Sequence, residues 1–181
     1  MAITNLVRDF PLAPLKRSAW LTFVVIALVV IAISVLVPRN GLPMLLRFAL
    51  PAFIILLMAA IGLALRRRSV TIEDRTLVVR AALYTRRIDI DALDLAGARS
   101  VDLAEHTEFS PTIKLNGYGL PGFLAGHFLL RDRKRAFCLL TDRSRVLILP
   151  ERDGRLLLLS PERPRQLLDA LNALVVPAMR R

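Results

Sequence analysis

Cysteine is nearly absent from this chain, because Cys138 is the only one among 181 residues. A single cysteine excludes an intrachain disulfide and any zinc site built from paired cysteines. Histidine is almost as rare, with His106 and His127 as its two examples. His106 stands two residues before Glu108, the spacing of zinc deaminases, but the cysteine pair of those sites is missing. We therefore expect no metal site and no cofactor, and we expect Cys138 to be a buried core residue.

Charge is absent from two long apolar runs, residues 18–37 and 48–65. At 1.5 Å of rise per residue, each run can cross or nearly cross a hydrocarbon layer of about 30 Å as a helix. The first run is too long for the apolar core of a signal peptide, and a second run follows at once. We therefore predict that residues 1–68 form a two-helix membrane anchor. The same lack of charge argues against a channel or carrier, since such proteins place ionisable groups within their spans.

Basic residues flank the two runs unevenly. Arg8 and the pair Lys16–Arg17 precede the first run, and three arginines, Arg66, Arg67 and Arg68, follow the second. Only Arg39 and Arg47 lie between the runs. The positive-inside rule then predicts a multi-pass protein of the bacterial inner membrane with both termini and the following domain in the cytoplasm. In this interpretation Lys16, Arg17, Arg66, Arg67 and Arg68 contact anionic headgroups, and the net charge of +11 fits such a surface.

From residue 69 onward the apolar residues fall in short, partly alternating segments that are typical of half-buried strands. Turn sequences such as 73–75, 132–133, 141–143 and 153–154 separate them. We predict seven to eight strands without intervening helices, which favours an antiparallel barrel or sandwich. The predicted segments are 69–73, 76–82, 84–90, 98–103, 126–131, 134–140, 145–150 and 156–160.

The C-terminal part changes to a helical pattern. Ser160, Pro161 and Glu162 resemble a helix start, with a capping hydroxyl, a proline in the first turn and a carboxylate facing the dipole. Four leucines at helical spacing follow and predict a buried face: Leu167, Leu168, Leu171 and Leu174. An antiparallel barrel needs a plug at its open end, and this helix would supply it. Residues 177–181 form a basic tail.

The order of strands plus one closing helix resembles that of pleckstrin-homology (PH)-like domains. The segment from Asn116 to Phe123, continued by Gly126-His127-Phe128, is similar to bacterial PH-like proteins that carry a membrane hairpin ahead of the domain. The resemblance covers about residues 69–174 and implies an α+β protein: a transmembrane helical hairpin followed by a PH-like β-barrel or sandwich over residues 69–176. The family resembles a binding scaffold and implies no chemistry. The acidic turn Glu73-Asp74-Arg75 stands where phosphoinositide-binding PH domains have a basic loop.

The glycines of this segment spell GxGxxG, but a dinucleotide site needs a helix directly after them, and Pro121 opposes one. We expect the glycines to serve positions of positive φ or close backbone approach. The segment is our candidate partner-binding loop: Asn116, Gly117, Tyr118, Gly119, Gly122 and Phe123. The alternative is that both aromatic rings belong to the core.

No catalytic signature connects the serine, histidine and aspartate residues, so we expect no enzyme. Basic residues are scattered along strands rather than clustered, which argues against nucleic acid. The expected function is a membrane-tethered binding module for a protein or a membrane, with anionic lipid and another membrane or membrane-associated protein as partners. The alternative is a regulatory or accessory subunit that acts through its transmembrane helices.

Overall fold

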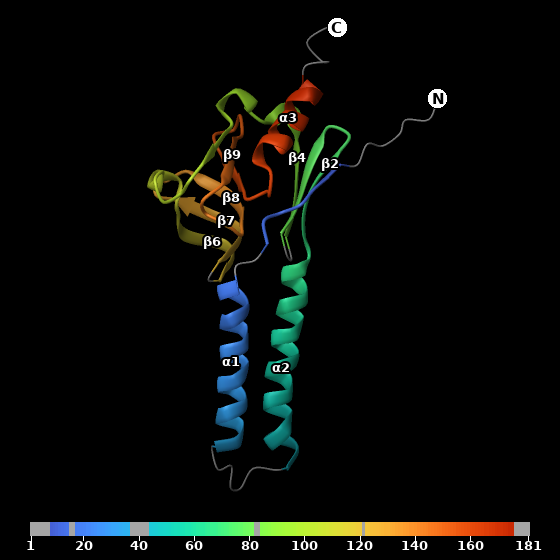
Figure 1. The fold of residues 1–181 in the computed structure, drawn as a ribbon, viewed down its shortest axis with the longest axis vertical. Helices are drawn as coiled ribbons and strands as arrows, with labels where there is room; N and C mark the ends of the chain where they lie inside the picture. The colour runs from blue at the N-terminus through green and yellow to red at the C-terminus, as the bar shows by residue number, and fades with distance from the viewer. Residues whose placement is uncertain (1–7, 15–16, 37–43, 82–83, 121, 176–181) are drawn as a thin grey trace, which may run out of the picture.

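The structure of this protein is a computed structural model that describes residues 8–14, 17–36, 44–81, 84–120 and 122–175 (Figure 1). The helices of this part are α1 (Arg17–Leu36), α2 (Met44–Arg66) and α3 (Pro164–Val175), with short 3-10 turns η1 (Ile90–Ala92), η2 (Leu95–Gly97) and η3 (Thr107–Phe109). The strands are β1 (Arg8–Phe10), β2 (Arg68–Glu73), β3 (Thr76–Ala81), β4 (Tyr84–Asp89), β5 (Arg99–Val101), β6 (Pro111–Leu120), β7 (Phe123–Leu130), β8 (Arg135–Leu140), β9 (Val146–Pro150) and β10 (Leu156–Leu159).

The strands form two sheets that pack as a sandwich. One sheet is an antiparallel meander in the order β1-β2-β3-β4, and the other has the order β5-β9-β10-β8-β7-β6. Within the second sheet β10 runs parallel to β8, and the other neighbours are antiparallel. The β-rich sandwich predicted from the alternating pattern is therefore present, with ten strands in the described residues instead of seven or eight.

The main core fills the space between the sheets and beneath α3. Phe123, Phe137, Leu139 and Leu149 are all almost fully buried there. Helix α3 covers one end of the sandwich and contacts η1 and η2 (Figure 1). Of the four leucines expected on its buried face, Leu167 and Leu171 are fully buried, and the other two are only partly exposed. Helix α3 is thus a structural part of the domain.

Helix α3 begins at Pro164, four residues later than Ser160, the residue expected to cap it. The Ser160 hydroxyl instead donates a hydrogen bond to the carbonyl oxygen of Asp142, 2.6 Å away. Its neighbour Pro161 pairs with Leu12 of the N-terminal segment. These long-range contacts use groups that would otherwise start a helix at Ser160, so α3 begins only at Pro164.

The N-terminal segment of the described residues is part of the sandwich. Strand β1 pairs antiparallel with β2, and the backbone then crosses to the segment before α3. There the Ala13 N–H donates to the Ser160 carbonyl at 3.0 Å, and the Glu162 N–H donates to the Pro11 carbonyl at 3.0 Å. These hydrogen bonds join the first sheet to the C-terminal element. Sequence patterns do not predict this strand, because three residues carry no readable alternation.

Helices α1 and α2 stand side by side below the sandwich in Figure 1 and contact each other. Over its described residues, neither helix is long and apolar enough to cross a membrane.

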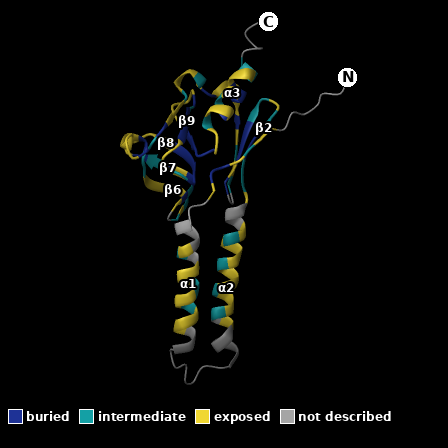
Figure 2. Cartoon of the chain, viewed as in Figure 1, coloured by how far each residue is buried: buried dark blue, intermediate teal, exposed yellow. Residues whose placement is uncertain are grey.

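This finding corrects several predictions that depended on the apolar runs. The transmembrane hairpin at 18–37 and 48–65 is not supported, nor is the multi-pass inner-membrane location with a cytoplasmic domain. The tethering of the domain and the alternative subunit acting through transmembrane helices lose their basis with it. Many large apolar side chains of both helices are exposed. The yellow segments of Figure 2 show this exposure along α1 and α2.

Candidate functional site

The glycine-rich segment forms a strand pair and not a loop. Residues 111–120 make up β6, the edge strand of the second sheet, and β7 returns antiparallel beside it. Gly117 and Gly126 face each other across this pair. A Cβ on Gly117 would lie 2.4 Å from the Ala125 carbonyl oxygen, and Gly126 has a φ of +119°. Close approach and positive φ therefore require glycine at these two positions.

The two aromatic rings of the segment have different surroundings. Phe123 is 1% exposed and belongs to the main core. Tyr118 is half-buried against Tyr84 of β4, with 5.7 Å between ring centroids. The Tyr84 hydroxyl also donates a hydrogen bond to Asn116 Oδ1 at 2.6 Å. Tyr118 and Asn116 thus hold β6 against the first sheet, while Phe123 is unavailable to a partner.

Strand β6 exposes apolar side chains along its first half. Ile113 and Leu115 are 55% and 51% exposed. Outside α1 and α2, they are the large hydrophobic side chains that stand strongly exposed in the described part of the protein. The pairing of β6 with β7 shifts register between Lys114 and Asn116, so Leu115 lies at an irregularity of the strand. We call these two exposed side chains, which are close in the sequence, the apolar stripe. Leu115 also reaches the rim of a cleft beside the strand.

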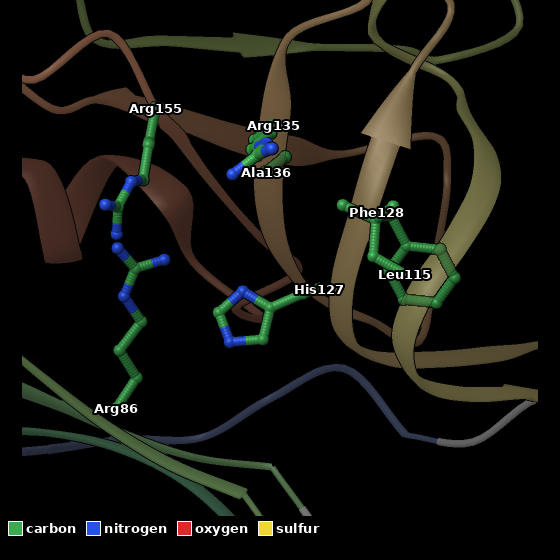
Figure 3. A pocket seen from close by; sticks show the side chains of 7 residues that line it. All are labelled: Arg86, Leu115, His127, Phe128, Arg135, Ala136 and Arg155. Atoms are coloured by element: carbon green, nitrogen blue, oxygen red, sulfur yellow. The ribbon is translucent and has the colours of Figure 1, made fainter.

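The cleft has a volume of about 280 Å³ and lies between strand β4 and the strands β6, β7 and β8, next to the β9–β10 turn. Three arginines and a histidine dominate its lining, together with Leu115, Phe128 and Ala136 (Figure 3). In Figure 3 the guanidinium ends of Arg86 and Arg155 point toward one another, and the His127 ring lies beside them. Sequence patterns do not assign these basic residues to a common site, because they come from four separate elements.

Arg86 is the most buried of the cleft arginines. It pairs with Glu151 at 2.7 Å, with side chains 15% and 7% exposed, and its guanidinium lies 5.5 Å from the centroid of the Phe137 ring. The second Glu151 oxygen, Oε1, is buried without a hydrogen-bond partner in the described residues. Burial raises the pKa of the Glu151 carboxyl, which Arg86 counteracts. A charged pair is therefore held here at a desolvation cost.

The surroundings of His127 indicate a positive electrostatic potential in the cleft. Its ring packs edge-on against Phe137, with 5.0 Å between centroids. Desolvation lowers the pKa of His127, and the charges of Arg86 and Arg155 lower it further. Arg155 itself pairs with Asp153 at 3.2 Å on the surface. An imidazolium is disfavoured by the same potential that favours an anion at this position.

The other residues singled out in the sequence lie away from the cleft. Arg17 begins α1, Arg66 ends α2, and Arg67 is exposed between α2 and β2; Lys16 lies outside the described residues. Burial lowers the pKa of Arg68 at the start of β2. With the transmembrane spans unsupported, the headgroup role of these residues loses its basis. Cys138 is buried, and the described residues contain no cluster of potential metal ligands.

The described fold is a small β-sandwich closed by one helix, with a cleft lined by basic side chains beside strand β6. The family model of the bacterial PH domain matches residues 68–175. The protein therefore belongs to the bacterial PH domain family, as the resemblance of its glycine segment implied. No curated protein and no solved structure matches it. PH domains are generally non-catalytic binding modules and commonly bind lipids or proteins.

Proposed function

We propose that this protein is a non-catalytic module that binds a protein partner along strand β6. The observation that carries the proposal is the stripe of Ile113 and Leu115, two exposed apolar side chains on an edge strand of an otherwise well-buried sandwich. Exposed apolar groups gathered at one place are typical of interaction surfaces, and the polar rim around a cleft adds specificity.

Only part of the segment that was predicted to bind a partner contributes to this surface. Tyr118 and Asn116 fix the second half of β6 through Tyr84. Gly117 allows β6 and β7 to approach closely, so the stripe is presented on a supported strand. A preorganised surface of this kind loses less conformational entropy when a partner binds. Phe123 contributes to stability only, because it is buried.

Site-specific photocrosslinking in the full-length protein tests the proposal. A photoreactive residue at Ile113 should form a discrete adduct with one protein, whereas the same residue at exposed Asp169 on α3 should not. The captured protein is then purified and its affinity measured. Leu115→Ser should weaken binding by about tenfold or more while the melting temperature changes little, because the side chain is half exposed. Equal adducts from both positions, or unchanged affinity of Leu115→Ser, would contradict the proposal.

A further inference from the structure

We propose that the cleft beside β6 binds a carboxylate of the protein partner, held between Arg86 and Arg155 and next to His127. This inference rests on the proposed function, because the cleft and the apolar stripe share Leu115. It adds the chemical group that the partner must present: an acidic side chain or a terminal carboxylate that follows an apolar contact on β6.

The charges of the cleft favour an anion of low charge. Arg86 is paired with Glu151 and Arg155 with Asp153, so two of the three guanidinium groups are already largely compensated. Arg135 lines the cleft without an ion-pair partner among the described residues. The surplus is therefore close to one positive charge, which suits a single carboxylate better than a doubly charged phosphate.

The guanidinium groups retain donors for a further anion. A guanidinium carries five N–H donors in a planar fork, and a carboxylate is its natural bidentate partner. The protein itself supplies the precedent, since both Arg86 and Arg155 hold carboxylates of the 151–155 turn. Arg155 is half exposed and can turn from Asp153 to an incoming group.

The size and lining of the cleft fit one group of side-chain size. Its volume of about 280 Å³ lies just under the usual range for small-molecule pockets, about 300–1,000 Å³. Apolar Leu115 and Phe128 line the end away from the arginine pair, as Figure 3 shows. An occupant that is apolar at one end and anionic at the other, such as a leucine followed by an acidic residue, matches this arrangement.

NMR titration of the full-length protein tests the carboxylate site with defined probes. The probe is a blocked Leu-Glu dipeptide, and its matched control is the Leu-Gln dipeptide. Inorganic phosphate and vesicles of anionic phospholipid are the remaining arms. We expect the Leu-Glu probe to shift the His127 resonances and to raise the pKa of His127, because a bound anion offsets the two arginines. The Leu-Gln probe should do neither.

Charge variants of the cleft should change the affinity for the Leu-Glu probe in opposite directions. Arg155→Gln should weaken binding of the Leu-Glu probe by about tenfold, because it removes one charged hydrogen bond. Asp153→Asn should strengthen it, because it frees Arg155. Arg143→Gln is the control. Arg143 is exposed and lies beyond the end of β8 at Leu140, whereas Arg135 of the cleft begins this strand. Preserved melting temperatures show that the variants remain folded.

The outcomes separate this inference from the proposed function. Equal binding of Leu-Gln, preference for phosphate or vesicles, or equal loss in Arg143→Gln would overturn the carboxylate site. Absence of any shift at probe concentrations of tens of millimolar would overturn it as well. If the Leu-Glu probe binds and the crosslink at Ile113 fails, the carboxylate site stands and the protein-binding strand does not. If the Arg155→Gln variant binds the crosslinked protein with full affinity, the carboxylate contact is wrong and the protein-binding strand is unaffected.

Discussion

Two regions of this molecule use the same apolar residues in opposite ways. In the sandwich, Leu139 and Leu149 are completely buried, whereas in α2 Leu56 and Leu63 are 69% and 64% exposed. Figure 2 shows this contrast as a dark core above helices that are largely exposed. Apolar content alone therefore says little about stability. What counts is the area that folding removes from water, at about 25 cal/mol per Å².

The largest expected effect comes from a matched pair of phenylalanines. Phe137 is 1% exposed and packs against Arg86 and His127, while Phe53 in α2 is 61% exposed. Phe137→Ala should lower the free energy of unfolding by about 3–5 kcal/mol, because it leaves a cavity. Phe53→Ala should change it by less than about 0.5 kcal/mol. Chemical denaturation of both full-length variants measures the difference, and similar losses would remove the contrast between the regions.

A matched pair of glycines gives the next effect. Gly126 has a φ of +119°, and a Cβ there would lie 2.5 Å from the Asn116 carbonyl oxygen. Gly126→Ala should therefore destabilise the protein by about 1–3 kcal/mol. A Cβ on Gly62 in α2 meets nothing within 4 Å, and alanine favours a helix by up to about 1 kcal/mol. Thermal melting should show opposite signs for the two alanines; the same sign would contradict this assignment of strain.

The smallest effect is a pH dependence confined to the sandwich. The pKa of His127 lies below its ordinary value, so the unfolded protein binds a proton more readily than the folded one. Stability should then be full above about pH 6.5 and fall as the pH drops toward the lowered pKa. The difference between wild type and His127→Gln isolates this contribution from that of Glu151. Identical pH profiles of stability would show that His127 does not sense Arg86 and Arg155.

The strands were predictable where the pattern is local. Segments such as 69–73 and 156–160 alternate or form short apolar runs between clear turns, and both match strands to within one residue. Strand β6 was missed because its signal is interrupted by a starting proline and two glycines. Its position depends on pairing with β7, which follows it directly, and on Tyr84 of β4, which is distant in the sequence.

The candidate site was only partly accessible to sequence reasoning. The glycine segment stood out in the sequence. Glycine is required at position 117 because the backbone of the neighbouring strand β7 lies too close for a side chain. The cleft did not stand out, because Arg86, Arg135 and Arg155 each look like a solvated strand end when taken alone. Only the packing of β4 against the second sheet brings them together. Run length likewise predicted spans that the described helices do not support.

Strand β1 has a consequence for the connectivity of the fold. Because β1 and β2 are adjacent antiparallel strands, everything from Pro11 to Arg67 is the connection of a β-hairpin, and α1 and α2 are an insertion within it. The entropy of closing a flexible loop grows only with the logarithm of its length, so a sheet tolerates such an insertion. One end of this insertion follows residues that hydrogen-bond to Ser160 and Glu162, and its other end leads directly into β2. A variant in which a short turn replaces residues 15–66 should still contain the complete sandwich.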